Sequence, residues 1–192
     1  MAKNIKITKE MIIDAAFKIT REKGFNKVSN REIAKELNCS IRPIYYQFKN
    51  ASELNVYLFK KVENYFYNYL TKDIKIKDKL YLSTGINYIN FAKYENNLFK
   101  LMYMYEGGKK TNEIISENDK ESTNYNEIVM KSTSLTKEKA KDFHLKMWIF
   151  THGLASLVSM GSVNFTEEEI VNLLRVEYKA LMLEEKDGKK WI

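Results

Sequence analysis

The sequence predicts an all-α protein, and three observations support this fold class. The 192 residues include only one proline and seven glycines, the residue types that interrupt helices most often. Apolar residues recur at helical spacing in successive segments, and capping residues precede several of them. With 44% apolar residues, the chain can bury a sizeable core. We expect about nine helices, arranged as an N-terminal three-helix domain followed by a C-terminal helical bundle.

Local signals place most of these helices. Thr8 can cap a first helix that runs to Lys23, where Gly24 ends it. Asn50 or Ser52 can cap a long helix over 51–70, and Thr166 with Glu169 forms a capping box for the last helix. The other helices are expected at 80–92, 95–105, 125–132 and 137–160, and the last at 167–185. The expected domains are 1–50, the connecting helix 51–70, and 71–192.

Two short helical patterns, 30–37 and 41–47, lie three residues apart. In the first, Ile33, Ala34 and Leu37 fall on one helical face, and Ser29 can cap its N-terminus. Ser40 can cap the second, with Pro43 in its first turn. The expected inner face of the second helix is Ile44, Tyr45 and Phe48, although Tyr45 fits a phosphate contact equally well. This arrangement is typical of a helix-turn-helix, whose second helix enters the major groove of DNA.

At this stretch the chain resembles the TetR family of bacterial transcriptional regulators. The residues that match are Ile33-Ala34, Leu37, Ser40, Tyr45-Tyr46-Gln47-Phe48-Lys49 and Leu54, with Ile13, Ala16, Gly24 and Phe25 upstream. Three positions depart from the family pattern: Asn38 replaces a turn glycine, Gln47 a histidine and Ala51 a lysine. A second resemblance, to a C-terminal subtype marked by tryptophan, histidine and glycine, rests on Trp148, His152 and Gly153.

The positive charge is concentrated at the N-terminus. Residues 1–50 contain 11 Lys/Arg and 5 Asp/Glu, a net charge of +6, out of +7 for the whole chain. Phosphate neutralisation needs positive charge at the DNA-binding domain, which favours a DNA partner over a solvated basic end. Lys3, Lys6 and Lys9 precede or begin the first helix and either follow the DNA backbone or only increase solubility.

The second helix of the motif supplies the candidate DNA contacts. Arg42 is the best candidate to read a base, because arginine pairs bidentately with guanine. Tyr45, Tyr46 and Lys49 are expected to contact phosphate, which sets position rather than sequence. The full set of candidates is Ser29, Asn30, Arg31, Ser40, Arg42, Pro43, Tyr45, Tyr46, Gln47 and Lys49. Such proteins commonly bind palindromic double-stranded DNA as dimers.

The C-terminal part supplies candidates for an effector site and for a homodimer interface. Large aromatic residues and methionines either line a cavity for a small apolar or aromatic effector or form an ordinary core. These residues are Phe66, Tyr88, Phe91, Phe99, Met102, Tyr103, Met147, Trp148 and His152. The last two helices can pair with those of a second copy, or their faces are internal. The candidate interface residues are Phe150, Leu154, Leu157, Val158, Leu173, Leu174, Tyr178 and Leu181.

Other classes of function find little support in the sequence. His144 and His152 lie about two helical turns, or about 12 Å, apart, which is too far for one metal ion. No catalytic or phosphate-loop motif is present, so we expect neither an enzyme nor a cofactor. The single Cys39 and the lack of a long apolar run fit a cytoplasmic protein without a membrane span. The sequence thus favours a ligand-released repressor; the alternative is a helical adaptor that binds protein and has lost its effector.

Overall fold

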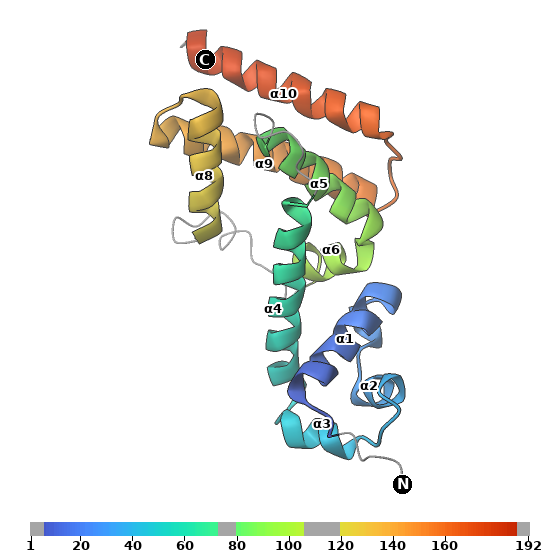
Figure 1. Cartoon of the computed structure of the whole chain (residues 1–192). Coiled ribbons are helices and arrows are strands. Elements are labelled where there is room, and N and C mark those ends of the chain that lie inside the picture. The colour runs from blue at the N-terminus through green and yellow to red at the C-terminus, as the bar shows by residue number, and fades with distance from the viewer. Residues whose placement is uncertain (1–5, 73–79, 106–119, 188–192) are drawn as a thin grey trace. The chain divides into compact units, whose positions relative to one another are not determined.

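The computed structural model describes residues 6–72, 80–105 and 120–187 (Figure 1). The prediction of an all-α fold is confirmed, since these ranges contain nine α-helices, the 3-10 turn η1 and no strand. None of the described helices is long and apolar enough to cross a bilayer. The helices are α1 (Lys9–Lys23), α2 (Asn30–Glu36), α3 (Arg42–Gln47), α4 (Ala51–Leu70), α5 (Leu80–Tyr94), α6 (Asn96–Tyr103), α8 (Lys120–Thr133), α9 (Lys137–Ser159) and α10 (Glu167–Asp187), and η1 covers Phe25–Lys27.

The chain divides into two compact units. Unit 1 comprises Met1–Tyr67 and Glu95–Gly108, and unit 2 comprises Asn68–Tyr94 and Lys109–Ile192. The division groups α6 with the N-terminal helices, because α6 packs on α1 and η1 and buries Leu98, Phe99, Leu101 and Met102. The expected domains 1–50, 51–70 and 71–192 place this segment with the C-terminal part instead.

In unit 1, the core is made by apolar residues from each of the first three helices. Ile12 of α1, Ile33 of α2 and Ile44 of α3 are at most 1% exposed. The expected signals at both ends of α1 are present, since Thr8 Oγ1 accepts a hydrogen bond from the Met11 N–H at 3.3 Å and Gly24, at φ 89°, follows its last residue. Asn38 has a φ of 49°, a conformation that asparagine tolerates better than most residues.

A buried carboxylate joins three helices of unit 1. Glu95, 6% exposed, precedes α6 and accepts two hydrogen bonds from the Arg21 guanidinium, one of them 2.7 Å from Nε. The Tyr65 hydroxyl of α4 donates a third, at 2.8 Å, and Asn97 donates from its side chain to the Arg21 carbonyl at 3.0 Å. These bonds connect α1, α4 and the start of α6, so the two sequence segments of the unit are fixed to one another.

In unit 2, α5 and α9 pack against one another, with α8 and α10 beside them (Figure 1). The core contains Ile89 and Phe91 of α5, Phe143 of α9 and Ile170 of α10, each at most 1% exposed. The expected capping box of α10 is present, because the Thr166 N–H donates to Glu169 Oε2 at 2.7 Å and the Glu169 N–H donates to Thr166 Oγ1 at 3.2 Å.

Two tyrosine–histidine pairs cross the packing between α5 and α9. Tyr81 bonds to His144 Nδ1 at 3.0 Å, and Tyr88 bonds to His152 Nδ1 at 2.8 Å. Burial lowers the pKa of His144 to about 4 and also lowers the pKa of His152. Both imidazoles are therefore neutral at pH 7 and contribute hydrogen bonds rather than charge to this core.

Two expectations about helix starts are wrong. Ser40 does not cap α3, which begins at Arg42 after Ile41 without a side-chain cap. Ile41 is already in the αR region, and the Ile44 and Tyr45 N–H groups bond to its carbonyl, so the turn starts from backbone interactions. The helix expected at 125–132 begins at Lys120. The sequence also predicts a charged linker or turn at 71–79 and a loop at 109–126, and residues 73–79 and 109–119 of these segments lie outside the described residues.

The first prediction concerns His144. Acidification from about pH 6.5 towards 4 should destabilise the protein, because the unfolded chain binds a proton that folded His144 does not. A shift from 6.5 to about 4 corresponds to about 3 kcal/mol lost over this range. Urea unfolding of wild type and His144→Gln at several pH values should show a shallower pH dependence in the variant. Parallel curves would contradict the burial of a neutral His144.

The second prediction concerns the Glu95 interactions. Arg21→Ala leaves a buried carboxylate with fewer donors and should lower the free energy of unfolding by about 1.5–3 kcal/mol. The matched control is Lys18→Ala on the same helix, which removes the exposed ion pair with Glu36 and should cost at most about 1 kcal/mol. Denaturant titration of both variants measures the difference, and equal losses would show that the Glu95 interactions add no special stability.

Candidate functional site

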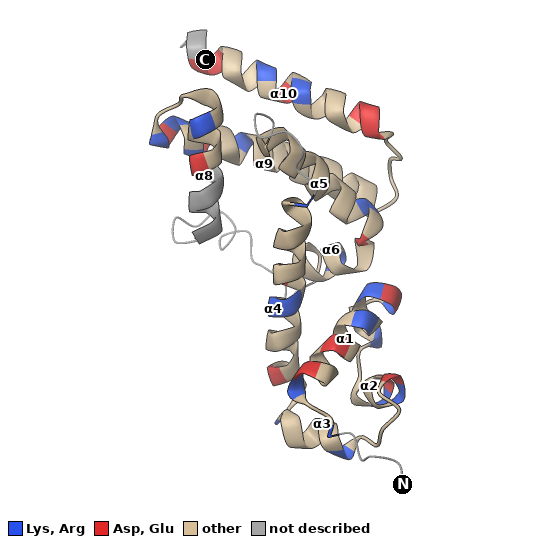
Figure 2. Ribbon diagram, in the orientation of Figure 1, with Lys and Arg blue, Asp and Glu red and all other residues tan. Residues whose placement is uncertain are grey.

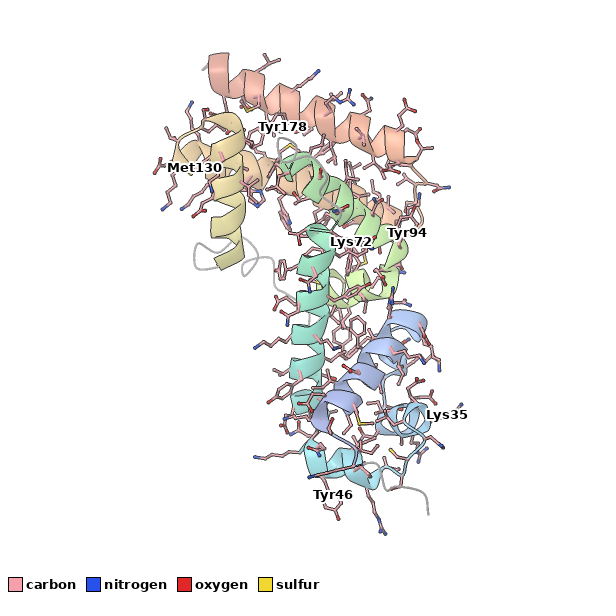
Figure 3. All side chains as sticks on the ribbon, viewed as in Figure 1. Lys35, Tyr46, Lys72, Tyr94, Met130 and Tyr178 are labelled. Carbon is pink, nitrogen blue, oxygen red and sulfur yellow. The ribbon has the colours of Figure 1, made fainter. Side chains whose placement is uncertain are left out.

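α3 presents one polar and aromatic face and buries the other. Ile44 is 1% exposed and Phe48, which follows α3, is 4% exposed. On the outer side Tyr45 is 64% and Tyr46 87% exposed, and Arg42 is exposed as well. Figure 3 shows the Tyr46 side chain directed away from α1 and α2. The expectation that Tyr45 belongs to the inner face is therefore wrong, because it lies about 100° around the helix from the buried Ile44.

The other expected DNA-contacting residues surround α3 or belong to α2. Arg31, Ser40 and Lys49 are exposed, and Asn30 and Pro43 are partly buried. Ser29 caps α2, since its hydroxyl accepts a hydrogen bond from the Glu32 N–H at 3.2 Å. Gln47 is half-buried, and its side-chain amide donates to the Ile7 carbonyl at 3.2 Å. Gln47 is thus engaged inside the protein rather than directed outwards.

The junction between α3 and α4 is built from charge and hydrogen bonds. Asn50 Oδ1 accepts from the Glu53 N–H at 2.9 Å, so Asn50 rather than Ser52 caps α4. Glu53 accepts from the Lys49 N–H at 2.9 Å and forms an ion pair with Lys9 at 3.0 Å. The Lys9 ammonium also lies 3.9 Å from the ring centroid of Tyr57. The Lys49 hydrogen bond, followed by the Lys9 interaction, lowers the pKa of the Glu53 carboxyl.

Not all the positive charge of the N-terminal part is available for phosphate. Lys9, Lys18 and Arg21 pair with carboxylates inside unit 1, and Lys23 lies 3.7 Å from Glu32. Basic residues nevertheless remain exposed on α2, on α3 and just after it, including Arg31, Lys35, Arg42 and Lys49. Figure 2 shows the Lys and Arg residues along α1 and α2. The outer face of the helix-turn-helix thus combines exposed cations with exposed tyrosines.

The candidate effector residues of unit 2 form part of an aromatic cluster. The Trp148 and His152 rings stack, with centroids 5.0 Å apart and planes 15° apart, and the Tyr88 hydroxyl bonds to Nδ1 at the edge of the His152 ring. Met147 is 5% exposed and Phe91 is fully buried. The described residues contain no group of three or more His, Cys, Asp or Glu that could hold a metal ion.

The other four candidate effector residues belong to unit 1. Phe66, Phe99 and Met102 are at most 3% exposed. Tyr103 lies against Phe99, with ring centroids 5.0 Å apart, and against Phe66, with centroids 6.1 Å apart. The nine residues predicted as one group therefore divide between the two compact units.

The candidate dimer residues differ in their exposure. Leu174 and Leu181 are at most 9% exposed and pack inside unit 2, whereas Leu157 is 40% exposed. The other five are partly buried, and Tyr178 packs against Phe143 with ring centroids 5.2 Å apart. Sequence reasoning missed three of the most exposed apolar residues on these helices, namely Ile149 on α9 and Val176 and Leu183 on α10, at 57–61% exposure. These three residues are not among the interface residues predicted from the sequence.

Sequence reasoning also missed contacts between distant segments. Nothing near Gln47 in the sequence indicates that it bonds to Ile7, and Glu95 and Arg21 are separated by 74 positions. A glutamate at the start of a helix is usually a solvated residue that favours the helix dipole. Only the fold shows that this carboxylate is buried.

The chain was compared with known protein families, curated proteins and solved structures. No curated protein matches the chain. A solved structure, that of a TetR-family transcriptional regulator from Haemophilus influenzae, is 19% identical and has a TM-score of 0.62. The match covers 90% of this chain and 94% of that one, and at this identity it supports the fold alone. Residues 12–55 match the family of bacterial regulatory proteins described as the tetR family. The N-terminal helix-turn-helix segment of the chain is thus similar to the N-terminal domain of TetR-family regulatory proteins.

Proposed function

We propose that the protein is a cytoplasmic repressor that binds a palindromic operator as a homodimer and is released by a small apolar or aromatic effector. The observation that carries the DNA contact is the outer face of α3, where Arg42 and Tyr46 are exposed opposite the buried Ile44. Arg42 reads a base in the major groove, while Tyr45, Tyr46 and Lys49 contact phosphates and fix the register.

The proposed homodimer uses the exposed apolar stripe of α9 and α10. Ile149 and Leu157 lie about two turns apart on α9, Met160 directly follows the helix, and all three are at least 40% exposed. A Cβ built on Gly153, between the first two, has no heavy atom within 4 Å. This open position allows a second helix to approach closely. Together with Val176 and Leu183 of α10, these residues are more exposed than most of the set named from the sequence, and their exposure supports pairing of two copies.

The proposed effector acts through one of the two aromatic groups. The group around Tyr88, Trp148 and His152 combines apolar rings with polar tips, which suits a small aromatic ligand. The chain passes from unit 2 into unit 1 between Tyr94 and Glu95, and α4 passes between the units near its end. In the proposed mechanism, these continuous connections carry a ligand-dependent change to α1 and α4 and alter the spacing of two recognition helices.

The experiment that tests this function is selection of the purified protein on random duplex DNA at low and moderate salt. Enrichment of one palindrome, with affinity falling steeply as salt rises, supports the repressor. The selected operator then serves to screen apolar and aromatic compounds by release of DNA. For a true effector, bound operator must lower the affinity of the protein for the effector by the same factor by which the effector lowers its affinity for the operator. Binding without enrichment would instead favour a protein-binding adaptor whose basic N-terminal part attracts DNA by charge alone.

The third prediction separates base contacts from phosphate contacts. Arg42→Ala should cost about 1–3 kcal/mol and relax the sequence preference at one position of each half-site. Tyr46→Ala should weaken binding to all sequences alike. Arg175→Ala and Tyr94→Ala are matched controls, because both residues are exposed in unit 2. Anisotropy titrations on the selected operator measure each effect, and wild-type affinity and preference in Arg42→Ala with Tyr46→Ala would refute the site.

The fourth prediction concerns the dimer. Val176→Glu places a charge in each half of a symmetric apolar interface and should convert the protein to monomers. Val56→Glu is the matched control, since Val56 is 67% exposed on α4 in the other unit. Sedimentation velocity over a range of concentrations reads the mass directly. A Val176→Glu protein that remains dimeric would place the interface elsewhere.

A further inference from the structure

The residues that precede α1 are attached to the end of the recognition helix. The strap, as we call residues 7–9, begins with Ile7, whose carbonyl accepts the Gln47 side-chain amide at 3.2 Å. Thr8 then caps α1 through the Met11 N–H. Gln47 is the last residue of α3, so this hydrogen bond joins the N-terminal segment to the helix that faces DNA.

Lys9 forms the second attachment of the strap. Its ammonium lies 4.8 Å from the ring centroid of Phe48 and 3.9 Å from that of Tyr57, and it pairs with Glu53 at 3.0 Å. These interactions, led by the Glu53 hydrogen bond, raise the pKa of Lys9. Lys9 is therefore held by the protein, and in turn it neutralises the Glu53 carboxylate that borders α3.

Lys6 lies one residue before the strap and is exposed. Consecutive Cα atoms are 3.8 Å apart, so the attachment of Ile7 to Gln47 keeps the Lys6 backbone close to the end of α3. The exposed Tyr46 and Lys49 lie at this same end of the helix. A cation in this position lies near the residues proposed to contact phosphate.

We propose that Lys6 contacts a DNA phosphate next to the α3 half-site, and that Gln47 positions it by holding the strap. The inference rests on the proposed binding of DNA through α3. It assigns different roles to two N-terminal lysines, because Lys9 is a structural residue and Lys6 a contact residue. It also gives Gln47 a role without a direct contact to DNA.

The test measures how salt weakens binding to a fluorescein-labelled duplex of mixed sequence. Lys6→Ala should reduce the slope of log affinity against log salt by about 0.9 for each bound chain. When salt rises from about 50 to 200 mM, the factor by which affinity falls should therefore be about 3.5 times smaller for the variant than for wild type, per bound chain. Lys100→Ala is the control for net charge, because Lys100 is exposed on α6 of the same unit. α6 packs on η1, which follows the C-terminal end of α1, whereas Lys6 precedes its N-terminal end.

A double-mutant cycle tests the positioning role of Gln47. Gln47→Met removes the donor at similar size, and Lys6→Ala should have little further effect on the slope in that background. Thermal unfolding by circular dichroism confirms that each variant is folded. If Gln47 contacted DNA itself, the two substitutions would act additively, and this result would overturn the positioning role.

Two further outcomes separate this inference from the proposed function. If wild type binds and Lys6→Ala keeps the same slope as Lys100→Ala, the Lys6 contact is overturned while DNA binding through α3 stands. If wild type does not bind duplex DNA even at low salt, the proposed function fails and this inference fails with it.

Discussion

The fold of unit 1 depends on burying one face of a helix that is too short to be stable alone. α3 has six residues, and isolated helices shorter than about 12–15 residues are marginal in water. Its conformation is therefore set by Ile44 and Phe48, which are buried in unit 1. Once these two side chains are buried, the exposure of Arg42 and Tyr46 follows from helix geometry. The core of unit 1 thus determines which residues can meet DNA.

The small size of this helical core also accounts for the basic side chains of unit 1 that form ion pairs within the unit. A small three-helix core gains from ion pairs at its edges, and here Lys9 and Arg21 bring together α1 with α4 and with the start of α6. Net charge alone consequently overstates the number of phosphate contacts. The exposure of individual residues is the better guide, and it favours Arg42 and Lys49 over Lys9.

How far the sequence predicts the structure depends on the range of the interaction involved. Helix ends with local caps, such as Thr8 and the Thr166–Glu169 box, could be predicted because donor and acceptor lie within three residues. The start of α3 could not, because backbone geometry at Ile41 replaced the expected side-chain cap. The role of Gln47 was equally inaccessible, since its partner is 40 residues away. Apolar spacing identified the face of α10 that contains Leu174, but it could not show that Leu174 packs inside unit 2 rather than against a second copy.

In the proposed mechanism, the buried Glu95 carboxylate links the end of α5 to α1 and α4. Glu95 directly follows Tyr94, the last residue of α5, and is held by Arg21 of α1 and Tyr65 of α4. Hydrogen bonds to a buried charge are costly to break, so a displacement at this junction is passed on rather than absorbed. An effector can shift the equilibrium only by its differential affinity for the two states. If the hydrogen bonds of this junction stay intact in both states, little of the difference in effector affinity is lost in breaking them. In the proposed mechanism, α1 and α4 therefore respond together.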